Sequence, residues 1–242
     1  MKPTLIMIGA DKGGVGKTTV ARSVLDYFSQ NNVFARAFDT EFPHGTLKRF
    51  FPEQTKVVDI AQTADQMRVL DTLGTSEVKV TVIDTRAGAL TTSLVALRDI
   101  GFLDAVKAEE FNFILFHILG PSISSLAEIS ETAPYVADAN YFLVKNYVND
   151  TTFFDWDPGT YNTYFNKVKS TGEVTIRKLN AMAYEKVEVA ATPFMNFIEN
   201  RTDDGAPADH SFVLRGYVRN WQNRNAEEFD RIQLLDIIAG RS

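Results

Sequence analysis

The sequence predicts an α/β protein built on a doubly wound, mostly parallel sheet with helices on both faces. Three observations support this fold class. Short apolar runs alternate with helical patterns, as they do in successive βαβ units. A glycine-rich loop stands between the first apolar run and the first helical pattern. Acidic residues follow directly on two later runs, at the sheet edge where ligands of such folds bind.

The apolar runs are the expected strands, and their near-continuous hydrophobicity is typical of strands covered on both faces. They are Leu5–Ile8, Val33–Phe38, Val78–Ile83, Phe113–Ile118, Tyr141–Val144 and Val187–Ala190. The helical patterns between them are Thr18–Gln30, Ala61–Leu73, Leu90–Ile100 and Ser122–Tyr135. Residues 150–182 are aromatic and irregular before a helical pattern begins, and a polar loop over 200–210 precedes a C-terminal helix at about 212–239. No long linker divides the chain, so we expect one domain over residues 1–242.

The composition excludes several classes of site. The chain has 242 residues, of which 45% are hydrophobic, and this is enough for one sizeable core. It has no cysteine, which excludes disulfides, thiolate zinc sites, cysteine-ligated iron–sulfur clusters and a cysteine nucleophile. A net charge of −6 makes nucleic acid and anionic lipid poor default partners. Because no stretch approaches a membrane span and no signal cleavage site follows the first apolar run, we expect a cytoplasmic protein.

The glycine-rich loop predicts a nucleoside triphosphate site. Taken from Asp11, the stretch "DKGGVGKT" follows a phosphate-binding loop pattern, between a strand and a helix. Its backbone N–H groups and the following helix N-terminus would face phosphate oxygens. Lys17 is expected to hold the β- and γ-phosphates, and Thr18 to offer its hydroxyl to Mg²⁺. The remaining residues predicted to bind nucleotide here are Lys12, Gly13, Gly14, Val15, Gly16 and Thr19.

Acidic residues at strand ends predict the metal site and the catalytic site. Asp84 ends the run "VKVTVID", so it is expected to lie at the same edge of the sheet as the phosphate loop. We expect it to hold Mg²⁺ there. Asp39 and Glu41 alternate after the second run, so both can face one side of the chain. A carboxylate in that place could orient the attacking water. A helix cap at Asp84 and a polar loop at Asp39 and Glu41 are the structural alternatives.

Together these motifs resemble the ParA/MinD family of ATPases, whose deviant phosphate loop reads K-G-G-x-x-K-[ST]. Here that loop is Lys12–Thr18, and the resemblance covers roughly residues 1–198. The family's D-x-D motif matches Asp39-Thr40-Glu41, and its D-x-P-x-G motif matches residues 84–88. The positions that meet adenine are matched by Asn146, in "YFLVKN", and by Pro193, in "VEVAATPF".

The resemblance implies a SIMIBI-type phosphate-loop NTPase that uses ATP and Mg²⁺. Two chains would form a homodimer around two ATP molecules, with Lys12 reaching the phosphates bound by the partner subunit. Cations between facing phosphates would offset their repulsion. The resemblance assigns catalysis to Lys12, Lys17, Asp39 and Glu41, and slow hydrolysis to ADP and phosphate would end the dimer. It also implies an activating, ParB-like partner protein and a role in plasmid or chromosome partitioning or cargo positioning.

Two residues depart from the family pattern. Glu41 is one methylene longer than the usual aspartate, and a displacement of about one ångström can lower a rate by ~10²-fold. We therefore expect slow hydrolysis, or a partner that corrects the geometry. Arg86 replaces the proline of the second motif, where it could contact a phosphate, a partner or solvent.

The end of the chain bears on membrane and DNA binding. Phe229, Ile232, Leu235 and Ile238 share one face of the C-terminal helix, whose polar face is mainly acidic. Anionic lipid would repel that face, so we expect the helix to dock on its own domain and membrane binding to be absent. Three arginines lie nearby with no acid among them, and they are either a nonspecific DNA contact or a solvated basic face; they are Arg215, Arg219 and Arg224.

Two other functions remain open from the sequence. A metabolic ATP-dependent ligase or kinase on the same fold, similar to dethiobiotin synthetase, would use the phosphate loop without needing Lys12. A MinD-like membrane-cycling ATPase would share the loop and add lipid binding.

Overall fold

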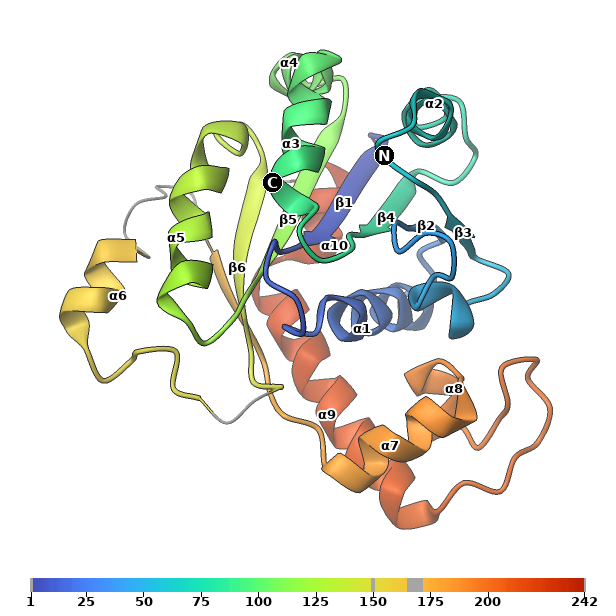
Figure 1. The fold of residues 1–242 in the computed structure, drawn as a ribbon. Coiled ribbons are helices and arrows are strands. Elements are labelled where there is room, and N and C mark those ends of the chain that lie inside the picture. The colour runs from blue at the N-terminus through green and yellow to red at the C-terminus, as the bar shows by residue number, and fades with distance from the viewer. Residues whose placement is uncertain (1, 149–150, 165–171, 242) are drawn as a thin grey trace.

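The computed structural model describes residues 2–148, 151–164 and 172–241, and it centres on one parallel seven-stranded sheet (Figure 1). The strand order is β3-β2-β4-β1-β5-β6-β7, and every pair of neighbours is parallel. The strands are β1 (Thr4–Gly9), β2 (Ala35–Asp39), β3 (Thr55–Val57), β4 (Val80–Asp84), β5 (Asn112–Leu119), β6 (Asn140–Asn146) and β7 (Gly172–Ile176). The order reverses beside β1, which places a ligand-binding crevice at the carboxyl end of that strand.

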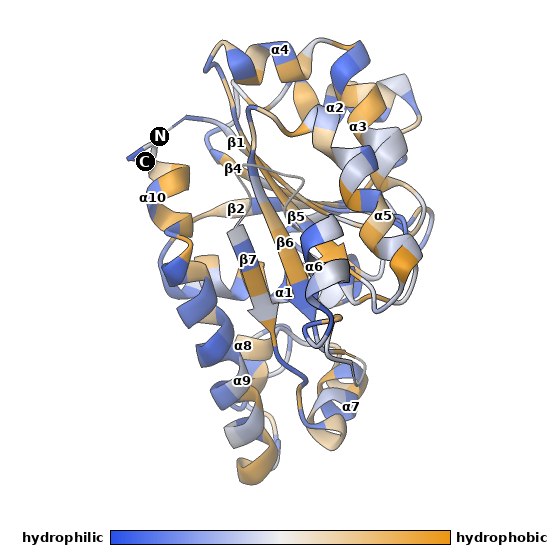
Figure 2. Ribbon diagram, turned by 90° about the vertical axis from the view of Figure 1, so that its left-hand side faces the viewer, coloured by the Kyte–Doolittle hydropathy of each residue, from blue (hydrophilic) through white to orange (hydrophobic). Residues whose placement is uncertain are grey.

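Helices cover both faces of the sheet, as the sequence predicts. They are α1 (Lys17–Gln30), α2 (Thr63–Leu70), α3 (Leu90–Asp99), α4 (Phe102–Lys107), α5 (Ile123–Thr132), α6 (Pro158–Tyr164), α7 (Ala181–Ala190), α8 (Phe194–Ile198), α9 (Phe212–Arg231) and α10 (Leu234–Ala239). Two short 3₁₀ helices are η1 (Leu47–Arg49) and η2 (Ala133–Tyr135). Figures 1 and 2 both show α7 and α8 beyond the carboxyl end of the sheet, on the side where the phosphate loop lies.

Alternate residues of each strand feed two separate cores, because successive side chains point to opposite faces of a sheet. In β1, Ile6 and Ile8 face a core shared with α1, α7, α8, α9 and α10. Leu5 and Met7 face a second core shared with α2, α3, α4 and α5. Figure 2 accordingly shows many hydrophobic residues along β6 and β7, which lie beside α9, and hydrophilic residues along much of α9. The fold class predicted from the sequence is therefore confirmed.

The first five predicted strands are confirmed within a few residues, but the sixth is wrong. Residues 187–190 belong to helix α7, which begins after Asn180, whose side chain accepts a hydrogen bond from the N–H of Ala183. Ala183 and Val187 are buried one helical turn apart, so the apolar spacing there follows the period of a helix. The last strand is instead β7, a half-exposed edge strand within the segment that we expected to be irregular. The short edge strand β3 was also missed.

The C-terminal helix expected over about 212–239 is divided into α9 and α10. The break lies at Gln233, which has a left-handed backbone with φ of 55°. The turn allows Leu234, Ile237 and Ile238 to pack on the same core as Phe229 of α9. The expected docking of this end of the chain on its own domain is thereby confirmed. Among the described residues, no helix is long and apolar enough to span a bilayer.

Candidate nucleotide site

The phosphate loop lies where the sequence predicts it, between the end of β1 and the start of α1. Gly14 and Gly16 have φ of 73° and 86°, in the left-handed region that favours glycine. A Cβ on Gly16 would lie 2.3 Å from the Nδ2 atom of Asn146, so this position also lacks room for a side chain. Because Lys17 is the first residue of α1, the positive end of that helix faces the space enclosed by the loop.

The two lysines of the loop have opposite environments. The Lys17 side chain is largely buried, with 8% relative exposure, and its Nζ atom donates to the backbone carbonyl of Lys12 across 3.3 Å. Burial lowers the pKa of the Lys17 ammonium, while Asp84 and Glu128 act in the opposite direction. Lys12 is exposed, and within the described residues the structure gives its Nζ atom no hydrogen bond or ion pair. One lysine is thus held inside the loop, and the other is directed to solvent.

Thr18 and Asp84, which we expect to hold Mg²⁺, contact each other directly. The Thr18 hydroxyl donates to Asp84 Oδ2 across 2.6 Å, whereas Asp84 Oδ1 is buried with no hydrogen-bond partner. Burial raises the pKa of Asp84 to about 8, and the nearby carboxylates of Asp39 and Glu41 add to this shift. A buried carboxylate with an unpaired oxygen beside a hydroxyl fits a divalent cation, whose charge would reverse that shift.

The donor set also indicates how such a cation would be held. Within the described part of the chain, no three His, Asp or Glu side chains gather to form a metal site by themselves. Mg²⁺ commonly keeps several waters and binds one or two protein groups together with substrate phosphates. The residues present therefore fit Mg²⁺ bound together with a nucleotide, and they do not form a complete protein cage.

Asp39 and Glu41 differ more than the sequence suggests. Asp39 is buried, and its carboxylate accepts the backbone N–H groups of Glu41 at 2.8 Å and Leu47 at 2.6 Å. Burial nevertheless raises the pKa of Asp39. Glu41 is exposed, and its carboxylate accepts the hydroxyl of Thr46. Asp39 therefore organises the loop between β2 and η1, and Glu41 is the carboxylate of the pair that can still turn toward a ligand.

The loop after β4 connects these parts of the site. The backbone N–H of Arg86 donates to the Thr40 hydroxyl across 2.8 Å, which joins this loop to the end of β2. Gly88 has φ of 73°, so it adopts the left-handed conformation. Arg86 and Gly88 are both exposed, and the Arg86 side chain has no partner among the described residues.

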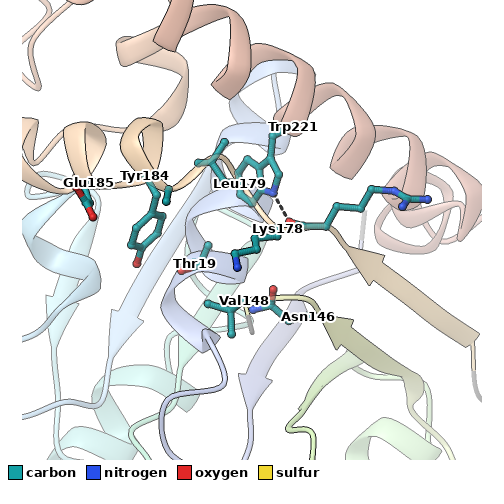
Figure 3. A pocket seen from close by; sticks show the side chains of 10 residues that line it. Thr19, Asn146, Val148, Lys178, Leu179, Tyr184, Glu185 and Trp221 are labelled. Atoms are coloured by element: carbon teal, nitrogen blue, oxygen red, sulfur yellow. Dashed lines mark hydrogen bonds between the residues drawn. The ribbon is translucent and has the colours of Figure 1, made fainter. Parts of the chain in front are cut away.

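A pocket of about 240 Å³ lies beside the phosphate loop (Figure 3). Side chains from α1, from the ends of β6 and β7, from α7 and from α9 converge around it. The lining residues are Thr19, Asn146, Val148, Arg177, Lys178, Leu179, Ala181, Tyr184, Glu185 and Trp221. Its lining combines apolar and aromatic side chains with polar and charged ones, as small-molecule sites commonly do.

Asn146 joins this pocket to the phosphate loop. Its Nδ2 atom donates to the carbonyl of Val15 across 2.9 Å, and the side chain is almost completely buried. Pro193, the other residue expected near the base, does not line the pocket. It is the residue directly before α8. The segment that leads to it is helix α7, and not the strand that the sequence analysis expected.

The sequence interpretation missed the part of the pocket that follows β7. The fragment "GEVTIRKL" carries the signal, because Val174 and Ile176 alternate before the polar Arg177 and Lys178. Recognising that strand would have placed residues 177–179 at the same sheet edge as Asn146. Trp221 also lines the pocket, and it is buried with its ring against Phe194.

The three arginines of α9 do not form one patch. Arg215 and Arg219 each donate to the backbone carbonyl of Ile198 across 3.4 Å, at the C-terminal end of α8. Arg224 lies about two and a half turns after Arg215, and so on the opposite side of the helix. The basic surface available to an anionic ligand is therefore smaller than the sequence suggests, and two of its members stabilise a helix end.

No protein-family model and no curated protein sequence matches the chain. Solved structures do resemble its fold. MinD cell division protein from Aquifex aeolicus aligns with a TM-score of 0.52 at 11% identity, covering 91% of this chain and 97% of that one. A plasmid partition protein from Borrelia burgdorferi aligns with a TM-score of 0.50 at 14% identity, covering 96% of this chain and 99% of that one. The chain thus has the α/β fold of MinD and of this plasmid partition protein.

Proposed function

We propose that the protein is a ParA-like, Mg²⁺-dependent ATPase that forms an ATP-dependent sandwich dimer and acts in plasmid or chromosome partitioning or in cargo positioning. The observation that carries this proposal is the contrast between the two lysines of one loop. Lys17 is buried against its own loop, as a residue that holds phosphates in its own subunit would be. Lys12 is exposed at the front of the loop, where it can reach phosphates bound by another chain.

The residues of one subunit would divide the nucleotide among them. The N–H groups of residues 13–16 and the Lys17 ammonium would hold the β- and γ-phosphates. Thr18 and Asp84 would hold Mg²⁺, which neutralises phosphate charge when it is bound. The base would enter the pocket between Tyr184 and Trp221, with Asn146 at its inner end. This arrangement uses the carboxyl ends of β1, β4, β6 and β7 together.

Hydrolysis would be slow, and the movement that brings Glu41 into position would regulate its rate. The Asp39 carboxylate is occupied by backbone donors, so it would position the loop instead of accepting a proton. Glu41 would have to leave Thr46 to orient a water, and its extra methylene changes its reach. A partner chain or a ParB-like activating protein could supply that change. The dimer would then persist as long as ATP remains unhydrolysed.

The surface that the protein binds, DNA or membrane, is a further part of the proposal. Nonspecific DNA contact would rest on Arg224 more than on Arg215 and Arg219, which contact the end of α8. A MinD-like membrane cycle gains no support from the apolar face of the C-terminal segment, because that face is packed on the domain core. We propose a cytoplasmic site of action on this basis.

Lys12→Ala tests the proposal against a metabolic ATP-dependent enzyme of the same fold. We expect this variant to bind fluorescent ATP with nearly unchanged affinity and to lose both the dimer and ATP turnover. Near-full turnover by Lys12→Ala would favour the metabolic alternative. ATP-dependent binding to nonspecific DNA at two salt concentrations, and co-sedimentation with anionic vesicles, would then identify the surface that the protein binds.

A further inference from the structure

Asp11 occupies the first position of the phosphate loop, where the general pattern has a glycine. Both of its backbone polar groups are engaged. Its N–H donates to Glu128 Oε2 across 3.0 Å, and its carbonyl accepts the N–H of Gly88 across 2.9 Å. The residue directly before Lys12 is therefore fixed from α5 on one side and from the loop after β4 on the other.

The side chain of Asp11 makes a third connection, to the start of α3. Its Oδ1 atom accepts the N–H of Leu90 across 2.8 Å, and Oδ2 accepts the hydroxyl of Thr91. The residue at the N-cap position of α3, Ala89, makes no side-chain cap hydrogen bond. Asp11 thus supplies, from a different segment, the acceptor that this helix terminus needs.

A buried polar chain supports this anchor from behind. Glu128 Oε2 lies 3.4 Å from His117 Nε2, and His117 Nδ1 lies 2.7 Å from the Tyr141 hydroxyl. His117 and Tyr141 are completely buried on neighbouring strands. The acceptor that holds the N–H of Asp11 is therefore held in place by the central sheet.

We propose that Asp11 is a positioning residue that couples the loop over 85–89 to Lys12. This inference rests on the proposed function, in which Lys12 acts across a dimer. The Lys12 Nζ atom contacts no partner among the described residues, so the backbone that Asp11 fixes determines where its flexible side chain starts. The Gly88–Asp11 hydrogen bond means that a movement of the loop after Asp84 moves the base of Lys12 as well. If this loop changes its position when a γ-phosphate is bound, that change would thereby reach the lysine offered to the partner subunit.

The test compares Asp11→Ala with Asp11→Asn, because asparagine caps a helix as well as aspartate does. We expect Asp11→Ala to weaken ATP-dependent dimerisation about tenfold, while the affinity of the monomer for fluorescent ATP changes less than about twofold. Asp11→Asn should restore most of the dimer. Amide hydrogen exchange should accelerate in Asp11→Ala at residues 12–13 and 88–91 together. Ser211→Ala, which removes the cap of α9, is the matched control and should leave dimerisation unchanged.

Thr91→Val gives a second, milder variant that keeps the shape of the side chain and removes one hydrogen bond to Asp11. It should weaken the dimer a few-fold in the same direction. Wild-type dimerisation of Asp11→Ala, or an equal loss in nucleotide affinity, would overturn the inference. Lys12→Ala is measured in parallel to separate the two proposals. If Lys12→Ala dimerises like the wild type, the proposed function fails; if only Asp11→Ala does, the positioning role alone fails.

Discussion

Thr18 donates its hydroxyl hydrogen to Asp84 Oδ2 across 2.6 Å, and the second oxygen of that carboxylate is buried without a partner. The pair joins the helix after the phosphate loop to the end of β4. A buried acid with one unsatisfied oxygen is unfavourable in the free protein, and a cation shared with a nucleotide would relieve it. The same two residues would therefore connect stability to ligand binding.

Asp84→Asn should separate those two effects. Because burial raises the pKa of Asp84 to about 8, stability from this group is lost as the pH rises from about 4 to about 8, and the loss is complete above that range. The amide variant should unfold at an equal or higher temperature than the wild type at pH 9 without ligand. It should also lose most of the stabilisation that Mg²⁺ with ATP provides. Thermal unfolding with and without Mg²⁺·ATP measures both, and full retention of the ligand-induced shift would contradict the metal assignment.

The pocket beside Asn146 can be tested with a ligand that lacks a base. Tyr184→Ala removes an aromatic wall, which should weaken ATP binding by roughly 1–2 kcal/mol. Binding of tripolyphosphate should not change, because the phosphate loop is intact. Lys186→Ala, on the same helix and outside the pocket, is the control. Competition titrations with both ligands give the answer, and an equal loss for tripolyphosphate would place the base elsewhere.

Asp26 of α1 predicts a pH dependence of stability. The residue is completely buried, and burial raises its pKa to about 7 despite the nearby Arg22. The folded protein holds this proton more tightly than the unfolded chain, whose aspartate pKa is near 3.9. Stability from this group is thus present below about pH 4 and is lost as the pH rises toward 7.

Asp26→Asn should therefore stabilise the protein at pH 8 by roughly 2 kcal/mol, and by much less at pH 4.5. Urea unfolding at the two pH values measures the difference. A variant that is less stable than the wild type at pH 8 would show that the ionised carboxylate contributes favourably, through Arg22.

The arginines of α9 should separate into two classes. Arg215→Ala removes a donor to the Ile198 carbonyl at the end of α8, and should reduce stability by about 1 kcal/mol. Arg224→Ala, on the opposite side of the helix, should leave stability unchanged. If the protein binds DNA, Arg224→Ala should lower that affinity and its salt dependence. Chemical unfolding and DNA titration of both variants are the measurements.

The phosphate-loop side of the site could be predicted from the sequence because its signals are local. Glycines at fixed positions, Lys17, Thr18 and the strand-end Asp84 all lie next to their own elements, and the topology brings them together. The opposite roles of Asp39 and Glu41 could not be predicted, because they depend on which backbone donors of a later loop reach the Asp39 carboxylate.

Apart from Asn146, the walls of the pocket could not be predicted from the sequence, because the patterns at residues 187–190 and 172–176 are misleading. The fragment "VEVA" is β-branched and short, and periodicity alone does not separate a short strand from a buried helix turn. The N-cap hydrogen bond to Asn180 and the burial of Ala183 and Val187 stabilise a helix there. The true edge strand β7 is only half buried, so its hydrophobic pattern is weak. The positioning role of Asp11 could not be predicted, because its partners lie on α3, on α5 and in the loop after β4.

The central claim, that ATP holds two chains together, is tested most directly by the mass of the Glu41→Ala variant in solution. This variant should retain bound ATP because hydrolysis is slowed. Light scattering after gel filtration should give twice the 27.1 kDa of one chain in saturating ATP and Mg²⁺, and one chain in ADP. A mass of one chain in both nucleotides would contradict the account.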